Sequence, residues 1–467
     1  MKRIHLIGVC GTAMATLAAM LKTRGFDVRG SDQNVYPPMS DFLAEQKITT
    51  LQGYDPAHIS GDLDLVIVGN AISRGNPELE EVLDRKIRYC SLPEAIRDHF
   101  LWGARSVVIA GTHGKTTTTS LTGWLLTHGG ADPSVLIGGI ADNFGGSYRV
   151  GGGRDFVIEG DEYDSAFFDK TAKFLKYLPD IAVVNNLEYD HADIYPDLES
   201  IRLAFRRFVN LIPRRGLLLA GADDEEALAL TKNARCRVET FGLSDRADWQ
   251  AHDLRVLEGG TAFSVRRRGE PAGTFEVALL GAYNVRNALA AMAVGAAVGL
   301  STDTMAAGLR AFKGVRRRMQ LRGSAGGVAV YDDFAHHPTA IAETLAGVRS
   351  AYPDRRIWAI FEPRSATSCR KVFQSEFARA FERADRILLP PIFRSTLPDE
   401  QRLSVEQLVG ELKEAGKDAR HLPGVQEIVD VVSREARQGD LVVVMSNGGF
   451  DNIHQRLLDA LQAHAAR

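Results

Sequence analysis

The chain has 467 residues, of which 45% are hydrophobic and 25% are charged, and its formal net charge at pH 7 is −3. This length exceeds what one hydrophobic core supports and indicates roughly three domains, while the small charge excludes a general attraction to nucleic acid or anionic membranes. The four cysteines are too scattered for a metal site or a disulfide framework, and neither a bilayer-spanning stretch nor a cleavable signal pattern is present. We therefore expect a reduced, cytoplasmic enzyme, either a monomer or a homodimer, without nucleic-acid or membrane partners.

The first segment alternates apolar strands with helix-like runs, the pattern of a parallel sheet covered by helices. Strands are predicted over 4–9, 27–30 and 63–68, and helices over 13–22, 40–46 and 77–85. Gly8 and Gly11 follow the first strand and Asp32 ends the second, which places a phosphate at a helix start and an acid near a nucleoside. The alternative is that the glycines only let strand and helix pack closely, because Cys10 interrupts the full dinucleotide pattern.

The second segment opens on the most informative stretch, Gly-Thr-His-Gly-Lys-Thr-Thr-Thr at 111–118, which joins a strand over 106–110 to a helix. Gly111 and Gly114 permit the torsions that point amide groups into one concavity, and the helix N-terminus adds partial positive charge. Lys115 can reach terminal phosphates, and Thr116 can ligate Mg²⁺. Two residues rather than four separate the glycines, yet a nucleoside triphosphate site is favoured over an ordinary strand–turn–helix joint.

Two polar clusters follow later strands of this segment, where open α/β sheets place their ligands. Strands are predicted over 156–159, 181–185 and 216–219, and a helix over 198–210. The acidic run at 159–164 could hold Mg²⁺ through Glu159, or it is only a solvated turn. His191, flanked by carboxylates, could bind a cation or orient a phosphoryl oxygen, or it is an ordinary loop histidine.

The second segment ends in short β-type pieces over 249–277 and a small-residue helix over 284–298. Asn284 and Asn287 offer amides to an adenine edge, or Asn284 simply caps the helix. The arginines at 316–318 are a solvated basic patch, or include one that clamps phosphate charge in a transition state.

The third segment repeats the strand–helix rhythm. Strands are predicted over 328–331, 357–361, 386–389 and 441–445. The run at 332–338 offers a carboxylate to a ribose hydroxyl with His336 nearby, or it only caps a helix starting near Pro338. Arg364 could hold a substrate carboxylate bidentately, and the turn at 445–450 could approach a ligand; a plain loop is the alternative for both.

These motifs, in this order, resemble the Mur ligase family. They are the phosphate loop, Glu-x-Asp-Glu, Asn-x-x-x-Asp-His-x-Asp, x-Asn-x-x-Asn-Ala, Arg-Arg and Asp-Asp-x-x-His-His-Pro, and they cover essentially the whole chain. The resemblance implies an α/β fold with a mostly parallel sheet and helices in each of three domains. These would be a Rossmann-like UDP-sugar domain (1–104), a central P-loop ATP-binding domain (105–322) and a Rossmann-like amine-substrate domain (323–467), with seams near 102–104 and 321–327.

The resemblance also implies ATP and Mg²⁺ as cofactors and assigns roles to side chains. The catalytic set is Lys115, Glu159, His191 and Arg318, and the metal ligands are Thr116, Glu159 and His191. The ATP-binding set is Gly111, Thr112, His113, Gly114, Lys115, Thr116, Thr117, Asn284, Asn287, Arg318, Asp333 and His336. The UDP-sugar set is Gly11, Thr12, Ala13, Met14, Ser31, Asp32 and Asn70, and the peptide set is Arg364, Ser365 and Asn447.

Within the family, the segments 34–40, 362–365 and 445–450 favour one activity. It joins the lactyl carboxylate of UDP-N-acetylmuramate to the tripeptide L-Ala-γ-D-Glu-meso-diaminopimelate through an acyl phosphate, in peptidoglycan recycling. Ligation of L-alanine alone is the alternative. Two positions depart from the family pattern: Tyr283 stands where histidine is usual, and no lysine lies between His191 and Pro213 to become a carbamylated metal ligand. A dehydrogenase and a non-catalytic nucleotide-gated binding module are the rival classes.

Overall fold

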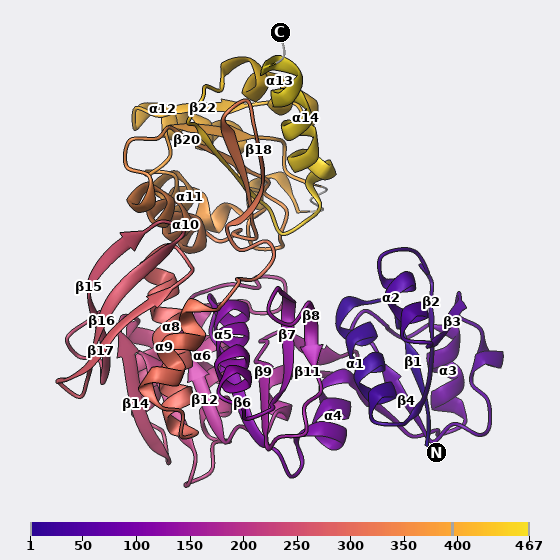
Figure 1. The fold of residues 1–467 in the computed structure, drawn as a ribbon. Coiled ribbons are helices and arrows are strands. Elements are labelled where there is room, and N and C mark those ends of the chain that lie inside the picture. The colour runs from indigo at the N-terminus through magenta and orange to yellow at the C-terminus, as the bar shows by residue number, and fades with distance from the viewer. Residues whose placement is uncertain (1, 394–396, 466–467) are drawn as a thin grey trace. The chain divides into compact units, whose positions relative to one another are not determined.

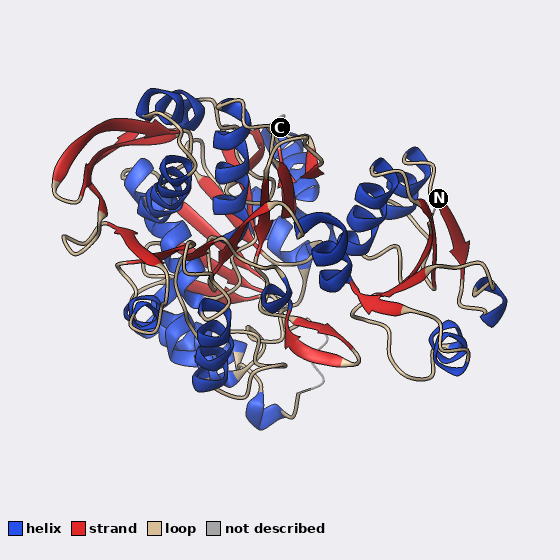
Figure 2. Cartoon of the chain, turned by 90° about the horizontal axis from the view of Figure 1, so that it is seen from below, coloured by secondary structure: helices blue, strands red, loops and turns tan. Residues whose placement is uncertain are grey.

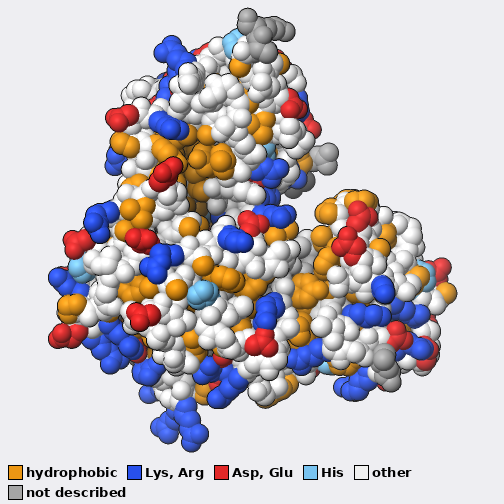
Figure 3. Space-filling model, in the orientation of Figure 1, with side chains coloured by type: hydrophobic (Ala, Val, Ile, Leu, Met, Phe, Trp, Pro, Cys, Tyr) orange, Lys and Arg blue, Asp and Glu red, His pale blue; other side chains and the backbone are white. Residues whose placement is uncertain are grey.

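The computed structural model describes residues 2–393 and 397–465, which form two compact units. The first holds the chain up to Glu188 together with Leu198–Gln250 and Leu289–Gly308. The second holds Tyr189–Asp197, Ala251–Ala288 and the chain from Leu309 onward. Among the described residues, no helix is both long and apolar enough to cross a membrane. Charged side chains of both signs are interspersed over the face shown in Figure 3, as the small net charge suggests.

The N-terminal part of the first unit is a five-stranded parallel sheet in the order β3-β2-β1-β4-β5 (Figure 1). Its strands are β1 (Arg3–Ile7), β2 (Asp27–Asp32), β3 (Thr49–Gln52), β4 (Leu65–Val68) and β5 (Tyr89–Ser91). Its helices are α1 (Thr12–Thr23), α2 (Met39–Glu45), α3 (Pro77–Asp84) and α4 (Leu92–Ile96), with a short 3₁₀ turn (Pro56–His58) and a π-helical turn (Arg97–Leu101). Buried Ile7, Val66 and Val68 pack against Leu79 and Val82 of α3, so one apolar face of the sheet meets the apolar stripe of that helix.

The larger sheet of the first unit has the order β14-β13-β12-β6-β9-β7-β8, and all its pairings except β7–β8 are parallel. Its strands are β6 (Arg105–Ala110), β7 (Ser134–Ala141), β8 (Gly146–Arg149), β9 (Asp155–Glu159), β12 (Ile181–Val184), β13 (Leu217–Gly221) and β14 (Arg237–Gly242). A separate hairpin is formed by β10 (Asp164–Ala166) and β11 (Asp169–Ala172). The helical elements are α5 (Lys115–His128), a 3₁₀ turn (Lys173–Lys176), α6 (Leu198–Val209), α7 (Glu225–Thr231) and α9 (Thr302–Arg310).

After β14 the chain continues into β15 (Trp249–Leu257), whose first residues pair with β14. The antiparallel strands β16 (Gly260–Arg267) and β17 (Glu270–Val277) follow, and α8 (Ala282–Ala297) comes next in the chain. The short β-type pieces predicted over 249–277 are therefore confirmed as strands.

The second unit contains a six-stranded sheet in the order β18-β19-β23-β20-β21-β22, parallel except for β18. Its strands are β18 (Gln320–Ala325), β19 (Val328–Asp333), β20 (Ile357–Phe361), β21 (Arg386–Leu389), β22 (Asp418–His421) and β23 (Leu441–Met445). Its helices are α10 (Pro338–Ala351), α11 (Gln374–Ala380), α12 (Val405–Glu414), α13 (Val425–Glu435) and α14 (Ile453–Ala465), with 3₁₀ turns at Lys371–Phe373, Asp399–Gln401 and Phe450–Asn452.

Both faces of this six-stranded sheet are covered by helices. Figure 2 shows the helices and strands of the described chain by colour. Along β20, Ile357, Ala359 and Phe361 pack with α10, α11 and α12, while Trp358 and Ile360 pack with α13 and α14. Successive side chains of a strand point to opposite faces, so burial of both faces requires the continuous apolar run of this strand. The α/β class with mostly parallel sheets is confirmed.

One predicted strand end needs correction, and one predicted domain seam falls inside a hairpin. The first strand ends at Ile7, not Val9, because Gly8 turns the chain at φ +84°. The seam predicted at 321–327 lies within the β18–β19 hairpin, so the third sheet begins at Gln320, before the boundary placed between 322 and 323. The strand end was placed too late because the apolar Val9 continues the run past the turn at Gly8.

A carboxylate is buried beneath the carboxyl end of β2. Glu78 of α3 is fully buried, and its Oε2 accepts a hydrogen bond from the Ser31 hydroxyl. The same oxygen lies 3.2 Å from His5 Nε2, and Oε1 lies 2.6 Å from His58 Nδ1. Burial alone would raise the pKa of Glu78, but hydrogen bonds from His5, Ser31 and His58 outweigh it and hold the pKa below its usual range.

This network makes the stability of the N-terminal sheet depend on pH. A folded-state pKa below the unfolded value of 4.5 stabilises the protein above that value, and the stabilisation is lost as the pH falls through the folded pKa. We expect Glu78→Gln to lower the free energy of unfolding by about 1–3 kcal/mol at pH 7, and by less at about pH 4. Urea unfolding at both pH values measures the difference, with Asp84→Asn, which changes an exposed acid at the end of the same helix, as the control. A loss that does not change with pH would contradict this role.

Candidate active site

Three strands of the first unit end at the same edge of the sheet. Ala110 of β6 pairs with Val184 of β12, and Ile109 pairs with Glu159 at the end of β9. The glycine loop, the acidic run and the Asn185–Glu188 stretch therefore start side by side. This is the edge at which open parallel sheets bind ligands.

The glycine loop is braced by the neighbouring strand end. Gly111 and Gly114 have φ angles of +128° and +80°, and a Cβ on Gly111 would lie 3.0 Å from the Asn185 nitrogen. The Thr112 amide donates to the Asn186 carbonyl (3.1 Å), and the His113 amide donates to Asn186 Oδ1 (2.7 Å). Because these two amides bond to Asn186, an anion would meet the amides of the first turn of α5, which a helix leaves without internal acceptors. The bracing role of Asn185 and Asn186 was not predicted.

The ammonium of Lys115, at the start of α5, lies against the backbone of the glycine loop. Its Nζ donates to both carboxylate oxygens of Glu162 (2.8 Å each) and to the Gly111 carbonyl (2.6 Å). Burial would lower the pKa of Lys115, but Glu162 and Asp161 outweigh it and raise the pKa above its usual range. The ammonium therefore stays charged where a terminal phosphate is expected. Glu162, only 2% exposed, is a partner that sequence reasoning did not single out.

Two predicted magnesium ligands are brought together. The Thr116 hydroxyl donates to Glu159 Oε1 at 3.0 Å, and the Gly138 amide donates to Glu159 Oε2 at 2.8 Å. A hydroxyl and a carboxylate at hydrogen-bond distance present the hard oxygen donors that Mg²⁺ prefers. These residues fit the metal. The third predicted ligand, His191, belongs to the second unit.

In the second unit, Asp190 lies among histidines. Asp190 and His191 are 4% and 9% exposed, and the His191 amide donates to Asp190 Oδ1 at 2.7 Å. Burial would raise the pKa of Asp190, but His191, His336 and His337 outweigh it and hold the pKa far below its usual range. The carboxylate therefore stays ionised and can orient these imidazoles.

The predicted adenine amides are buried at the start of α8. Asn284 and Asn287 are each 5% exposed. Asn284 Nδ2 donates to the Leu280 carbonyl at 2.8 Å, and Asn287 Nδ2 donates to Asn284 Oδ1 at 3.1 Å. Because α8 begins at Ala282, Asn284 lies inside the helix, and the alternative that it is the N-cap is wrong.

Asp333, at the end of β19, is held by backbone amides. Its Oδ1 accepts from Ala335 (2.8 Å) and its Oδ2 from Met319 (2.7 Å), and burial raises its pKa. The Arg318 guanidinium carbon lies 4.9 Å from the centre of the Phe334 ring. His336 Nδ1 lies 3.0 Å from the Phe334 carbonyl. The predicted helix start is confirmed, because α10 begins at Pro338.

The residues predicted for the UDP-sugar surround the turn before α1. Asp32 braces this turn by accepting from the Cys10 amide (2.9 Å) and the Asn34 amide (3.1 Å). Ser31 is fully buried with its hydroxyl on Glu78, so any contact with a ligand would come from its backbone. The other members lie in or beside the first turn of α1 (Gly11, Thr12, Ala13 and Met14) and after β4 (Asn70).

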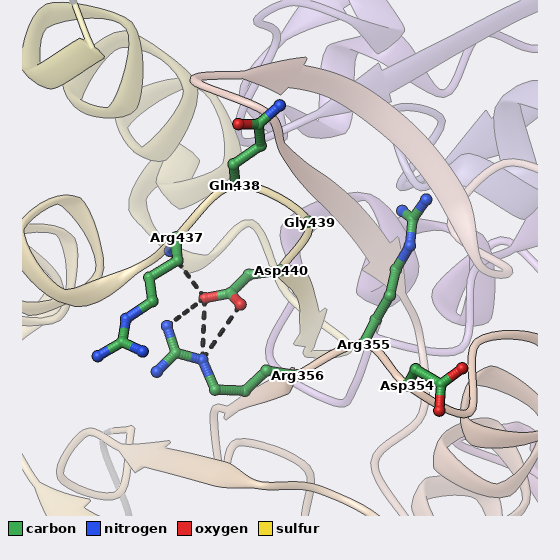
Figure 4. Close-up of a pocket in the computed structure, with 7 residues that line it drawn as sticks. All are labelled: Asp354, Arg355, Arg356, Arg437, Gln438, Gly439 and Asp440. Carbon is green, nitrogen blue, oxygen red and sulfur yellow. Dashed lines mark hydrogen bonds and ion pairs between the residues drawn. The ribbon is translucent and has the colours of Figure 1, made fainter.

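A small pocket of about 280 Å³ lies at the opposite edge of the six-stranded sheet, where β20 and β23 begin (Figure 4). Arg356 is neutralised there by Asp440, with a shortest contact of 2.6 Å. Figure 4 shows Arg355 and Arg437 pointing away from each other. These arginines do not converge on an anion, and none of the predicted site residues lines the pocket.

Comparison with known proteins gives consistent matches along the chain. Three family models match: "Mur ligase family, catalytic domain" at 3–101, "Mur ligase middle domain" at 109–295 and "Mur ligase, glutamate ligase domain" at 317–448. The UDP-N-acetylmuramate–L-alanyl-γ-D-glutamyl-meso-2,6-diaminoheptandioate ligase of Escherichia coli K12 is 42% identical over 465 residues, 99% of each chain. The UDP-N-acetylmuramate–L-alanine ligase of Acetivibrio thermocellus is 35% identical over 460 residues, 98% of this chain and 96% of that protein. A crystal structure of a murein peptide ligase from Psychrobacter arcticus aligns with a TM-score of 0.70 and 37% identity over 99% of both chains.

Proposed function

Because this chain belongs to the Mur ligase family, we propose that it joins the lactyl carboxylate of UDP-N-acetylmuramate to the α-amine of L-Ala-γ-D-Glu-meso-diaminopimelate, using ATP. Among the relatives compared, the protein named for the tripeptide is 42% identical and the one named for alanine is 35% identical. The observation that carries the chemistry is the grouping of Lys115, Thr116 and Glu159 at one sheet edge. A cytoplasmic role in peptidoglycan recycling is part of this proposal.

The reaction needs an activated acid, because an amine cannot displace oxide from a carboxylate. A carboxylate oxygen would attack the γ-phosphorus of ATP, ADP would leave, and an acyl phosphate would form. The tripeptide amine would then attack the carbonyl carbon, the C–O bond to phosphate would break, and the amine would lose a proton. Such transfers depend mainly on positioning and on neutralising charge on the phosphoryl oxygens.

In this proposal each side chain has a defined task. Lys115 neutralises γ-phosphate charge, and Arg318 is proposed to stabilise phosphate charge in the transition state. Thr116 and Glu159 would hold Mg²⁺, which when bound withdraws charge from the phosphate oxygens. His191, whose Nε2 lies 3.9 Å from Asp190 Oδ2, is proposed to hold a second cation. Asn284, Asn287, Asp333 and His336 are proposed to recognise the nucleoside.

Phosphate release measured with UDP-N-acetylmuramate and ATP tests the assignment when only the amine is varied. We expect the tripeptide to give the highest kcat/KM and L-alanine to be a poor substrate. A tetrapeptide defines how much additional chain is accepted. Preference for L-alanine would favour the alternative ligase activity. ATP binding without phosphate release, whatever amine is added, would instead indicate a binding module.

A further inference from the structure

The Arg364 side chain is held in place by an aromatic ring and by an acidic side chain. Its guanidinium carbon lies 3.7 Å from the centre of the Phe393 ring, the distance of a close cation–π stack. Its Nη1 lies 3.6 Å from Glu362 Oε1, which is an ion pair but too long for a hydrogen bond. The side chain is 31% exposed. Phe393 is separated from the arginine by a long stretch of chain, and sequence reasoning did not include it.

A second strand end closes around the same side chain. A Cβ placed on Gly448 would lie 2.5 Å from Cδ and Cζ of Arg364, closer than real side chains approach. Ser446 links the two loops: its hydroxyl donates to Glu362 Oε2 (2.5 Å) and accepts from the Gly448 amide (2.9 Å). Phe361 and Met445 pair in neighbouring strands, so this arrangement is set by the register of the sheet.

The stacked guanidinium has capacity for a ligand. Arginine carries five N–H donors in a planar fork that matches a carboxylate. Among the described residues, the only polar contact of this guanidinium is the long ion pair with Glu362. The residue next to Gly448, Asn447, has a buried Oδ1 without a hydrogen-bond partner in the described part of the chain. A fixed cation, and an acceptor without a partner in the loop that approaches it, are typical of a subsite for a polar, acidic ligand.

We propose that Phe393, Glu362 and Gly448 are positioning residues that hold Arg364 as a clamp for a peptide carboxylate beyond the reacting alanine, and so favour tripeptide over alanine. This inference rests on the proposed function. Alanine has a single carboxylate next to its amine, whereas the tripeptide has further carboxylates on its second and third residues. An arginine fixed at a distance from the amine can therefore bind the tripeptide but not alanine, whose carboxylate lies too close to the amine. This selectivity is lost when the arginine is displaced.

Gly448→Ala tests the clamp without removing any charged group. Gly448 has no left-handed φ, so its backbone accepts alanine, and the atoms in the way belong to the flexible side chain of Arg364. Losing a charged hydrogen bond should raise KM for the tripeptide about tenfold or more. We expect kcat and the KM values for ATP and UDP-N-acetylmuramate to change less than about twofold.

Gly449→Ala is the matched control, because Gly449 has φ −79° and a Cβ there meets nothing within 4 Å. It should leave all constants unchanged. Phe393→Leu, which removes the stack but not the charge, should raise KM for the tripeptide while leaving the weak reaction with L-alanine as it was. An unchanged tripeptide KM in Gly448→Ala, or an equal rise for both amines, would overturn the clamp. Failure of the wild-type protein to use the tripeptide would instead overturn the proposed function.

Discussion

Replacing Lys115 by methionine should lower kcat by about a thousandfold or more, while the affinity for UDP-N-acetylmuramate stays within about twofold. Methionine keeps much of the length and apolar packing of the side chain but removes the ammonium that lies over the Gly111 carbonyl. Binding of the UDP-sugar is assigned to the N-terminal sheet and should not depend on this charge. Phosphate release measures the first effect, and calorimetric titration with the UDP-sugar measures the second.

The ammonium also has a structural partner, and the experiment must separate the two roles. Without Lys115, the carboxylate of Glu162 is buried without its counter-charge, which destabilises a protein strongly. The double variant Lys115→Met with Glu162→Gln removes that charge as well. We expect it to recover most of the lost thermal stability and none of the lost kcat. Recovery of activity together with stability would show that Lys115 only supports the loop.

Local chemistry made the shape of the glycine loop predictable. Gly111, Gly114, Lys115 and Thr116 are adjacent, and both the left-handed glycines and the helix start at Lys115 follow from the residue types. Strand-end placement likewise predicted Glu159, because a parallel sheet brings carboxyl ends together.

Contacts across long stretches of chain were not predictable in this way. The bond between the His113 amide and Asn186 joins residues 73 positions apart, and that between Lys115 and Glu162 spans 47. Both depend on the order β12-β6-β9 in the sheet, which periodicity does not specify. The contact between Gly448 and Arg364 has the same origin, because the pairing of β20 with β23 brings these two loops together.

Burial also distinguishes neighbouring residues for which the sequence predicts the same role. Ser31 and Asp32 are neighbours at the end of β2, yet the hydroxyl of Ser31 faces the buried Glu78 while Asp32 braces the turn before α1. Alternation along a strand sends adjacent side chains to opposite faces. The sequence identifies the strand end, and burial in the structure distinguishes the two side chains at it.

Thr116→Val and Glu159→Gln should each lower kcat/KM by about a hundredfold or more and raise the Mg²⁺ concentration needed for half-maximal rate. The reason is that the Thr116 hydroxyl lies 3.0 Å from Glu159 Oε1, so both oxygens could ligate one cation in place of their hydrogen bond. Thr119→Val is the matched control on the same helix, since its buried hydroxyl has no hydrogen-bond partner among the described residues. It should be neutral for both activity and stability.

The double variant Thr116→Val with Glu159→Gln decides whether the two oxygens ligate one ion. If both residues ligate the same Mg²⁺, removing the second ligand should lower kcat/KM little once the first is gone, so the two effects will not add in free energy. If the residues act independently, the two fold-losses in kcat/KM will multiply. A Mg²⁺ titration of the wild-type protein, the two single variants, the double variant and the Thr119→Val control measures this directly. Additive losses with an unchanged Mg²⁺ requirement would remove Thr116 and Glu159 from the metal site and leave the loop and Lys115 as the only support for nucleotide chemistry at this edge of the sheet.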